Sequence, residues 1–230
     1  DEAGGTDSFD IVLDAAPVAN VTVALSSSDA AEGTLTLESV EFTPENWNSP
    51  QEVTVTGADD DVADGPQVYT VVTGATSSTD DAYDGIEVPD VEVTNLDDET
   101  AGVRLEAEAD LETREDGGDA TFDLVLTSQP TADVTVTLAS SDASEGTLLE
   151  SELTFTAENW DAPQEVGVQG VDDEVADGNV DYQVTVEAVN STDPDYEGLA
   201  VDATVALSNI DDDSASVSLD VGDGVVVQES

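Results

Sequence analysis

The chain has 230 residues and a formal net charge of −54 at pH 7, because 56 Asp and Glu face only two Lys and Arg. Such a surface has no basic patch to meet phosphate, which excludes nucleic acid as a partner. No run of about 18 apolar residues occurs, so we expect no membrane span in this segment. His and Cys are absent, and so is Lys, because both basic residues are arginine. Most pairings of nucleophile and base need one of these residues, so we predict that the protein is not an enzyme.

The predicted elements are short β-strands, each marked by alternation of apolar and polar residues. No segment has a convincing helical period. In the first half of the chain we expect strands at 7–13, 20–26, 39–43, 51–57, 67–73 and 87–94. In the second half we expect them at 102–109, 120–127, 133–139, 152–156, 164–170, 180–189 and 202–208. Seven such strands in one unit predict an all-β fold of the seven-stranded, Greek-key, immunoglobulin-like β-sandwich type.

The two series of strands are tandem copies of one unit. Trp47 and Trp160 follow the same Glu-Asn pair and lie 113 residues apart, and Phe9 matches Phe122. The first copy is expected to lack its leading strand, since Glu2 matches Glu115. We therefore predict a first repeat at 1–98, a second repeat at 99–213 and the first strand of a third repeat at 214–230.

The missing strand at the start and the spare strand at the end have two explanations: the sequence is cut from an array in the middle of a repeat, or strands are exchanged between molecules. Residues 214–228 could complete the open first repeat of the next molecule by adding a strand to its sheet, giving a head-to-tail filament of like subunits. The expected partners are thus neighbouring repeats of the same protein, and like subunits in such a filament.

Each of the ten aromatic residues has an aromatic counterpart in the other copy. A ligand site needs only one copy, so duplication favours a role in the framework over the stacking of carbohydrate.

Three loops of each predicted sandwich end at one pole and are dense in carboxylates. They are the turn before the second strand, the loop between the fifth and sixth strands, and the exit from the last strand. Left alone these carboxylates repel one another, and Ca²⁺, which takes six to eight oxygen ligands, would relieve the repulsion. The candidate ligands are Glu2, Asp59, Asp60, Asp61, Asp97 and Asp98 in the first repeat and Glu115, Asp172, Asp173, Glu174, Asp211, Asp212 and Asp213 in the second.

The alternative is that these side chains form a solvated acidic coat. The absence of Lys and the abundance of Asp, Glu, Ala, Val and Thr resemble proteins of salt-loving organisms, haloarchaea above all. Molar salt shortens the Debye length to about 3 Å and would screen such a coat. Glu32 and Glu145 lie at the same pole, and for them we expect a solvated turn. Asn20 and Asn190 begin glycosylation sequons. In a chain rich in Thr and Ser, chance occurrence of the motif explains them as well as actual glycosylation does.

The order of motifs resembles the Calx-beta family. In each copy a Phe-Thr pair (Phe42 and Thr43, Phe155 and Thr156) precedes Val-x-Val-x-Gly-x-Asp-Asp and then Asn-x-Asp-Asp. The resemblance covers nearly the whole of each copy, and it implies that the acidic loops bind Ca²⁺ at one end of the sandwich. This sequence differs from the family in having Trp47 and Trp160 and in its high content of acidic residues.

The expected function is a non-enzymatic structural or adhesive repeat of an extracellular, cell-surface protein or filament. Ca²⁺ at the acidic pole between repeats would stiffen the array, because the pole includes the linker to the next repeat. The alternative function is an adhesin module that binds polysaccharide or cells.

Overall fold

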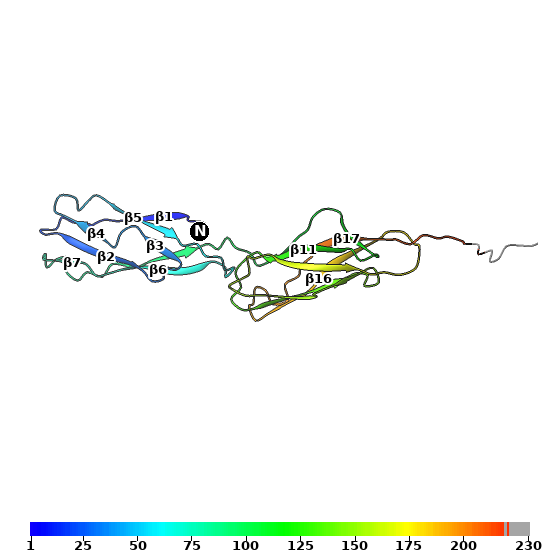
Figure 1. Cartoon of the computed structure of the whole chain (residues 1–230). Helices are drawn as coiled ribbons and strands as arrows, with labels where there is room; N and C mark the ends of the chain where they lie inside the picture. Colours follow the sequence, from blue (N-terminus) through cyan, green and yellow to red (C-terminus); the bar gives the residue numbers. More distant parts are fainter. Residues whose placement is uncertain (219, 221–230) are drawn as a thin grey trace, which may run out of the picture. The chain divides into compact units, whose positions relative to one another are not determined.

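The computed structural model describes residues 1–218 and 220, and within them every regular element is a β-strand (Figure 1). The chain divides into two compact units. The first comprises Asp1–Gly102 with Thr127–Thr131, and the second comprises Val103–Leu126 with the residues from Ala132 onward. Each unit is built from two sheets.

The first unit has one sheet with strand order β1-β5-β3 and another with order β4-β2-β6-β8, with the short β7 paired to β2. All pairings between these strands are antiparallel, and Phe9 of β1 stands opposite Val53 of β5. The strands are β1 (Thr6–Ile11), β2 (Val21–Ser27), β3 (Gly33–Leu35), β4 (Ser39–Phe42), β5 (Gln51–Gly57), β6 (Gln67–Thr73), β7 (Ser77–Ser78) and β8 (Val91–Asn95).

The second unit repeats this plan with a strand added to each sheet, giving the orders β13-β15-β11-β9 and β10-β17-β16-β12-β14. Among its described strand pairs, β10 with β17 is the parallel one. The strands are β9 (Val103–Glu106), β10 (Leu111–Arg114), β11 (Asp119–Leu126), β12 (Val134–Ser140), β13 (Gly146–Leu148), β14 (Glu152–Phe155), β15 (Gln164–Gly170), β16 (Val180–Ser191) and β17 (Thr204–Ile210).

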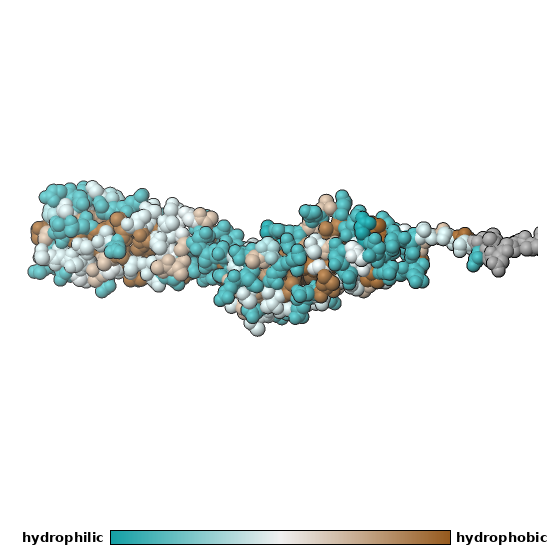
Figure 2. Space-filling view, viewed as in Figure 1, coloured by the Kyte–Doolittle hydropathy of each residue, from teal (hydrophilic) through white to brown (hydrophobic). Residues whose placement is uncertain are grey.

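The core of each unit lies between its two sheets. In β2 every second residue is buried, and its inward residues Val21 and Val23 form one apolar cluster with Val53 and Val55 of the other sheet. Burial of each such side chain contributes about 1.5–3 kcal/mol, which makes this packing the main source of stability. Hydrophilic residues are spread over the visible surface of both units, with residues of intermediate and apolar character between them (Figure 2).

The predicted all-β sandwich class is confirmed, and each predicted strand has a counterpart in the structure. The leading strand predicted at 102–109 differs in one respect. Its counterpart β9 ends at Glu106, and an unpredicted strand, β10, follows in the other sheet after Asp110, which takes a left-handed φ of 60°. The short strands β3, β7 and β13 were not predicted either.

Two sequence predictions about the division of the chain stay open. The repeat boundaries at 1–98 and 99–213 remain predictions. The strand of a third repeat predicted at 214–230 falls mostly on residues 219 and 221–230, outside the described residues, and residues 214–218 and 220 belong to no strand.

A buried tyrosine lies against a glycine in each unit. A Cβ added to Gly146 would overlap the ring and hydroxyl of Tyr182, and Gly33 has the same relation to Tyr69. Only a residue without a side chain therefore lets the tyrosine come this close to the backbone.

We predict that Gly146→Ala lowers the free energy of unfolding by about 1–3 kcal/mol, because the added methyl group displaces the Tyr182 ring. Denaturant unfolding in molar KCl measures the change. Thr147→Ala, at the exposed neighbouring position, is the control and should cost well under half as much. Equal effects of the two substitutions would contradict the close approach of ring and backbone.

Candidate metal centre

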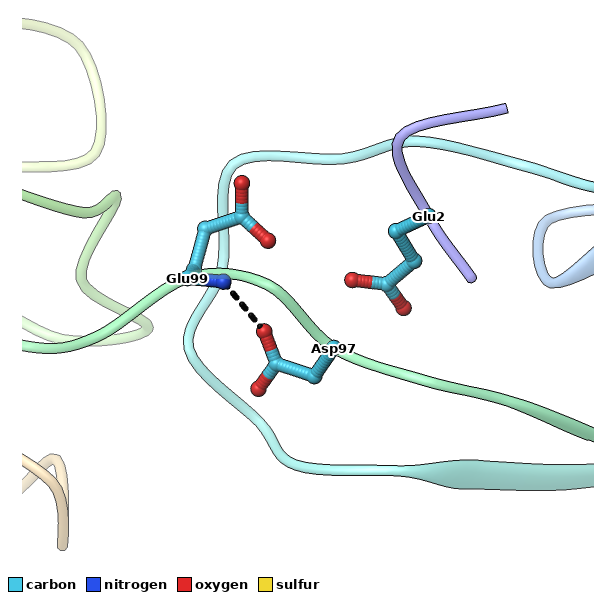
Figure 3. A group of neighbouring side chains, drawn as sticks. All are labelled: Glu2, Asp97 and Glu99. Atoms are coloured by element: carbon cyan, nitrogen blue, oxygen red, sulfur yellow. Dashed lines mark hydrogen bonds between the residues drawn. The ribbon is translucent and has the colours of Figure 1, made fainter. Parts of the chain in front are cut away.

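Three segments of the first unit bring carboxylates to one pole. Glu2 lies just before β1, Asp59 and Asp60 follow β5, and Asp97 follows β8. Figure 3 shows Glu2, Asp97 and Glu99 with their carboxylates turned toward one another. The pole is therefore assembled from parts of the chain that the sandwich fold makes neighbours.

Glu2 is the most deeply buried acid of this pole, with 2% of its surface exposed. Its backbone N–H donates to the carbonyl of Leu96 (2.9 Å), which ties the first residues to the exit of β8. Its Oε1 accepts a hydrogen bond from Asn95 Nδ2 (3.1 Å), whereas Oε2 is buried and has no hydrogen-bond partner among the described residues. A buried carboxylate oxygen without a donor costs free energy unless a proton or a cation meets it.

Backbone N–H groups donate to both carboxylate oxygens of Asp97. Its Oδ1 accepts from the N–H of Glu99 (2.8 Å), and its Oδ2 accepts from the N–H of Gly65 (2.5 Å). Gly65 has a φ of 76°, a conformation that glycine adopts without strain, and this turns its N–H toward the carboxylate. Oε2 of Glu99 is buried nearby without a partner among the described residues.

The carboxylate oxygens of this pole form two groups that share Glu99. One group joins Glu2, Asp97 and Glu99, and the other joins Asp59, Asp98 and Glu99, with the oxygens of each group within 4.8 Å of one another. Oxygens that bind one Ca²⁺ at 2.3–2.6 Å can be at most about 5 Å apart. Each group is thus compact enough for a single ion to contact three carboxylates.

The second unit forms the same kind of pole. Oxygens of Glu115, Asp173 and Asp213 lie within 4.8 Å of one another. Glu115 has 5% of its surface exposed, and its Oε2 is buried with no hydrogen-bond partner in the described part of the chain. The backbone N–H of Gly178 donates to Asp211 (2.6 Å), as that of Gly65 does to Asp97.

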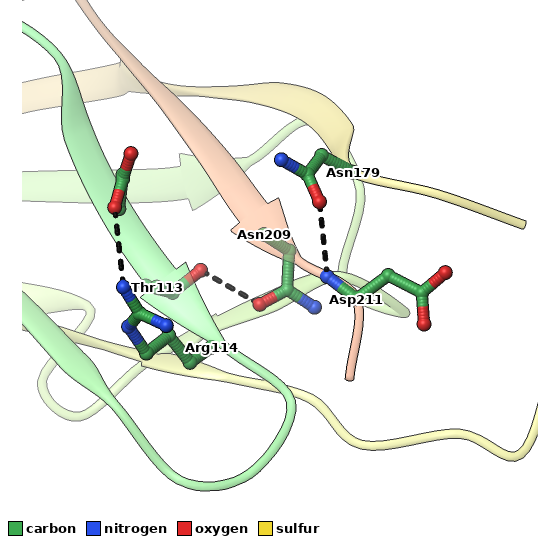
Figure 4. A network of polar contacts seen from close by, with 6 residues as sticks. Thr113, Arg114, Asn179, Asn209 and Asp211 are labelled. Atoms are coloured by element: carbon green, nitrogen blue, oxygen red, sulfur yellow. Dashed lines mark hydrogen bonds and ion pairs between the residues drawn. The ribbon is translucent and has the colours of Figure 1, made fainter. Parts of the chain in front are cut away.

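The exit of β17 is tied down by further hydrogen bonds. Asn179 Oδ1 accepts from the N–H of Asp211 (3.3 Å; Figure 4), and Asp211 Oδ1 accepts from the N–H of Asp213 (2.7 Å). These bonds fix the loop that carries two of the acidic residues.

Burial and the charges of neighbouring acids raise the pKa values of three buried or half-buried glutamates, Glu2, Glu99 and Glu115. Loss of water around Glu2, with the charges of Asp60 and Asp97 beside it, raises its pKa from the ordinary 4.5 to about 7. Burial and the charge of Asp98 raise the pKa of Glu99. In the second unit, burial and the neighbouring charge of Asp211 raise the pKa of Glu115.

The arrangement suits a divalent cation with oxygen ligands. Carboxylate oxygens from loops, with room for more ligands, match the coordination of Ca²⁺, whereas Mg²⁺ keeps most of its waters and prefers fewer protein ligands. The residues that would hold it are Glu2, Asp97 and Glu99 at the first pole and Glu115, Asp173 and Asp213 at the second.

The structure places the acidic residues that were predicted as ligands in different positions relative to the compact groups. Seven of them belong to the compact groups: Glu2, Asp59, Asp97, Asp98, Glu115, Asp173 and Asp213. Asp60 and Asp211 lie near enough to raise the pKa of a buried glutamate. Asp172 and Asp212 lie near enough to raise the pKa of Asp213. Asp61 and Glu174 are exposed and belong to none of the groups.

The sequence analysis did not predict Glu99 as a ligand, and it predicted the wrong environment for Glu145. Glu99 aligns with Asp213, so comparison of the two copies could have identified it. Glu145, expected to be a solvated turn residue, is 9% exposed and accepts a hydrogen bond from Asn209 (3.3 Å). Glu32 has the same relation to Asn95 (3.4 Å). The predicted glycosylation positions Asn20 and Asn190 are both exposed, and their use stays a prediction.

No protein-family model matches the chain, and no curated protein matches its sequence. The fold is similar to that of solved structures, among them the following three. CBD12 from CALX1.2 is 11% identical, with a TM-score of 0.38 over 90% of this chain and 94% of that one. The calcium binding domain CBD12 of CALX1.1 is 14% identical, with a TM-score of 0.35 over 87% of this chain and 76% of that one.

The third is domains 4 and 5 of the S-layer protein SbsC, 14% identical, with a TM-score of 0.32 over 82% of this chain and 69% of that one. The described part of the chain has no helix long and apolar enough to cross a membrane.

The raised pKa of Glu2 predicts how pH acts on the ion-free protein. The folded state holds this proton up to about pH 7, whereas the unfolded chain releases it near 4.5, so the folded state binds more protons in between. The free energy of unfolding should therefore fall as the pH rises through this interval. Ca²⁺ needs the ionised carboxylate, so its affinity should rise over the same interval.

Denaturant unfolding with chelator and Ca²⁺ titration, both from pH 4.5 to 8 in molar KCl, check this. Glu2→Gln is the reference, because the difference between it and the parent isolates this one group from the other acids. A difference that stays constant across the interval would contradict the raised pKa.

Proposed function

We propose that the protein is a non-enzymatic structural repeat that binds Ca²⁺ at the acidic pole of each unit. In the first unit the ion joins the segment before β1 to the exit of β8, and in the second unit it joins the turn between β10 and β11 to the exit of β17. Because that exit leads along the chain into the next repeat, a bound ion reduces the freedom of the linker. Neighbouring repeats of the same protein are the expected partners in such an array.

One observation carries the proposal. At each pole a glutamate that is at least 95% buried, Glu2 or Glu115, keeps one carboxylate oxygen without a hydrogen-bond donor in the described residues. A solvated acidic coat would expose these oxygens to water. Burial of the same unpartnered oxygen in both copies instead supports a cation between the loops.

The duplicated aromatic residues support a framework role. Phe42, Phe155, Tyr69 and Tyr182 are buried in the cores, so these side chains offer no platform for stacking sugars. This favours a spacer over the alternative of a polysaccharide-binding adhesin module. We further propose a cell-surface location in a high-salt setting, where molar salt screens the net charge of −54 that the ions leave largely uncompensated.

Thermal unfolding in molar KCl, with Ca²⁺ or with chelator at constant ionic strength, tests the proposal. Binding to the folded state should raise the midpoint, with about 2.7 kcal/mol of added stability at a hundredfold excess over the dissociation constant. We expect Glu2→Gln and Glu115→Gln to have two effects of opposite sign. Each should raise the stability of the ion-free protein above pH 7, because it removes a buried charge, and each should reduce the shift caused by Ca²⁺.

Glu41→Gln is the matched control, because it removes the same charge from an exposed position in β4. It should leave the Ca²⁺ shift unchanged. If the shift is as large in the double variant Glu2→Gln/Glu115→Gln as in the parent, the ions bind elsewhere. The absence of any shift would leave the poles as a salt-adapted surface.

A further inference from the structure

The two glycosylation sequons lie at the same corner of the two units, although they come from different strands. Asn20 directly precedes β2, at the point where Val21 pairs with Ser78 of β7. Asn190 lies in β16, where it pairs with Thr135 near the start of β12. Since β2 and β12 are the same strand of the repeat, both asparagines stand where this strand begins.

A hydrogen bond shows how close the two places are. In the second copy Asp133 occupies the position of Asn20, 113 residues further on. The carbonyl of Asp133 accepts a hydrogen bond from the hydroxyl of Ser191 (2.9 Å), the residue that follows Asn190. Two motifs that arose by chance in different strands have no physical reason to converge on one corner of the fold.

This corner lies at the end of the sandwich away from the acidic pole. β2 is antiparallel to β6, and β6 is antiparallel to β8, so β2 starts at the end opposite the exit of β8 and its Asp97. Figure 1 shows β7, which pairs with the start of β2, at the end of the first unit away from the amino terminus. A group attached at this corner therefore leaves the acidic pole uncovered.

Both asparagine side chains face solvent. Asn20 and Asn190 are exposed, whereas the valines beside them in the chain, Val21 and Val189, are 0% and 2% exposed. Successive side chains of an extended chain point to opposite faces, so burial of each valine turns its asparagine outward. In the first sequon Thr22 lies two residues on and hence on the face of Asn20, and in the second Thr192 is exposed.

The amide groups of these two asparagines hold no part of the fold together. Among the described residues, neither side-chain amide takes part in a hydrogen bond. Five other asparagines of the chain use their side chains in hydrogen bonds that fix turns or strand ends: Asn46, Asn95, Asn159, Asn179 and Asn209. The asparagines of the sequons are thus available for a covalent reaction that those five could undergo only by losing a structural contact.

We propose that Asn20 and Asn190 are N-glycosylated. The reaction joins the anomeric carbon of an oligosaccharide to Nδ2 of the asparagine and breaks the bond between that carbon and the phosphate of a polyprenyl carrier. The carrier phosphate leaves with the electron pair of the broken bond, and the amide gives up one proton, so no oxidant or reductant is needed. The inference rests on the proposed cell-surface location, because the lipid-linked donor acts on chains that leave the cytoplasm.

Peptide mass spectrometry of the protein taken from the cells that produce it tests the proposal. Cleavage after Asp and Glu places Asn20 in the peptide 15–29 and Asn190 in the peptide 188–193. We expect both peptides to carry a sugar mass on the asparagine and to release sugar fragments on collision. Asn48 is exposed as well but has Pro50 two residues on, so its peptide is the internal control and should be unmodified.

Removal of the hydroxyl separates glycosylation at the sequon from other modification. Thr22→Val and Thr192→Val keep the asparagine and the shape of the neighbouring side chain, and each should abolish the sugar at its own site alone. Thr22→Ser is the matched control, because it keeps the hydroxyl and should keep the sugar. Unfolding midpoints report whether these variants fold as the parent does. A sugar on Asn20 that survives Thr22→Val would contradict transfer directed by the sequon.

A new sequon shows whether the chain meets the donor at all. Asp133→Asn creates the order Asn-Val-Thr at the place in the second unit that Asn20 holds in the first, and it should gain a sugar. A sugar there with Asn20 and Asn190 bare would overturn the proposal, and a bare peptide at one of them would overturn the assignment of that site.

The absence of sugar at all three positions would also overturn the proposal. Protease treatment of intact cells then distinguishes this failure from failure of the proposed location. Release of the chain by the protease would leave the cell-surface location standing without the sugar, whereas protection of the chain would contradict both.

Discussion

Repulsion between carboxylates buried at the pole of each sandwich is the constraint on which the rest of the structure depends. Glu2 and Glu115 lie inside the fold although the chain carries a net charge of −54, and each keeps an oxygen without a donor among the described residues. Such groups destabilise a fold unless protons or cations neutralise them. The raised pKa of Glu2 is the response available to the protein when no ion is present.

The sandwich supplies the rigid frame that holds these charges together. Two sheets packed through alternating valines fix the strand ends, and the loops after β5 and β8 then converge on the residues before β1. Glycines complete the geometry. A Cβ at Gly57 or Gly170 would overlap the pole asparagine of its unit and the backbone carbonyl of Asp1 or Arg114, so the loops could not approach so closely. The site is therefore a consequence of core packing more than of any single motif.

The sequence predicts the fold well because period-2 alternation and a repeat of 113 residues are long-range patterns that many residues share. It predicts the pole from strand order, since the acidic loops must meet at one end. It does not identify the individual ligands, because Asp97 and Asp98 are neighbours of the same type yet belong to different groups. Nor does it show β10, the strand that follows the left-handed backbone at Asp110.

A crystal structure of the protein grown in molar KCl with millimolar Ca²⁺ would show directly whether the buried carboxylates hold the ion. We expect anomalous density for Ca²⁺ among Glu2, Asp97 and Glu99 and among Glu115, Asp173 and Asp213, with the buried oxygens as ligands. Poles without a divalent ion under these conditions, with Glu2 and Glu115 still buried or turned out into solvent, would contradict it.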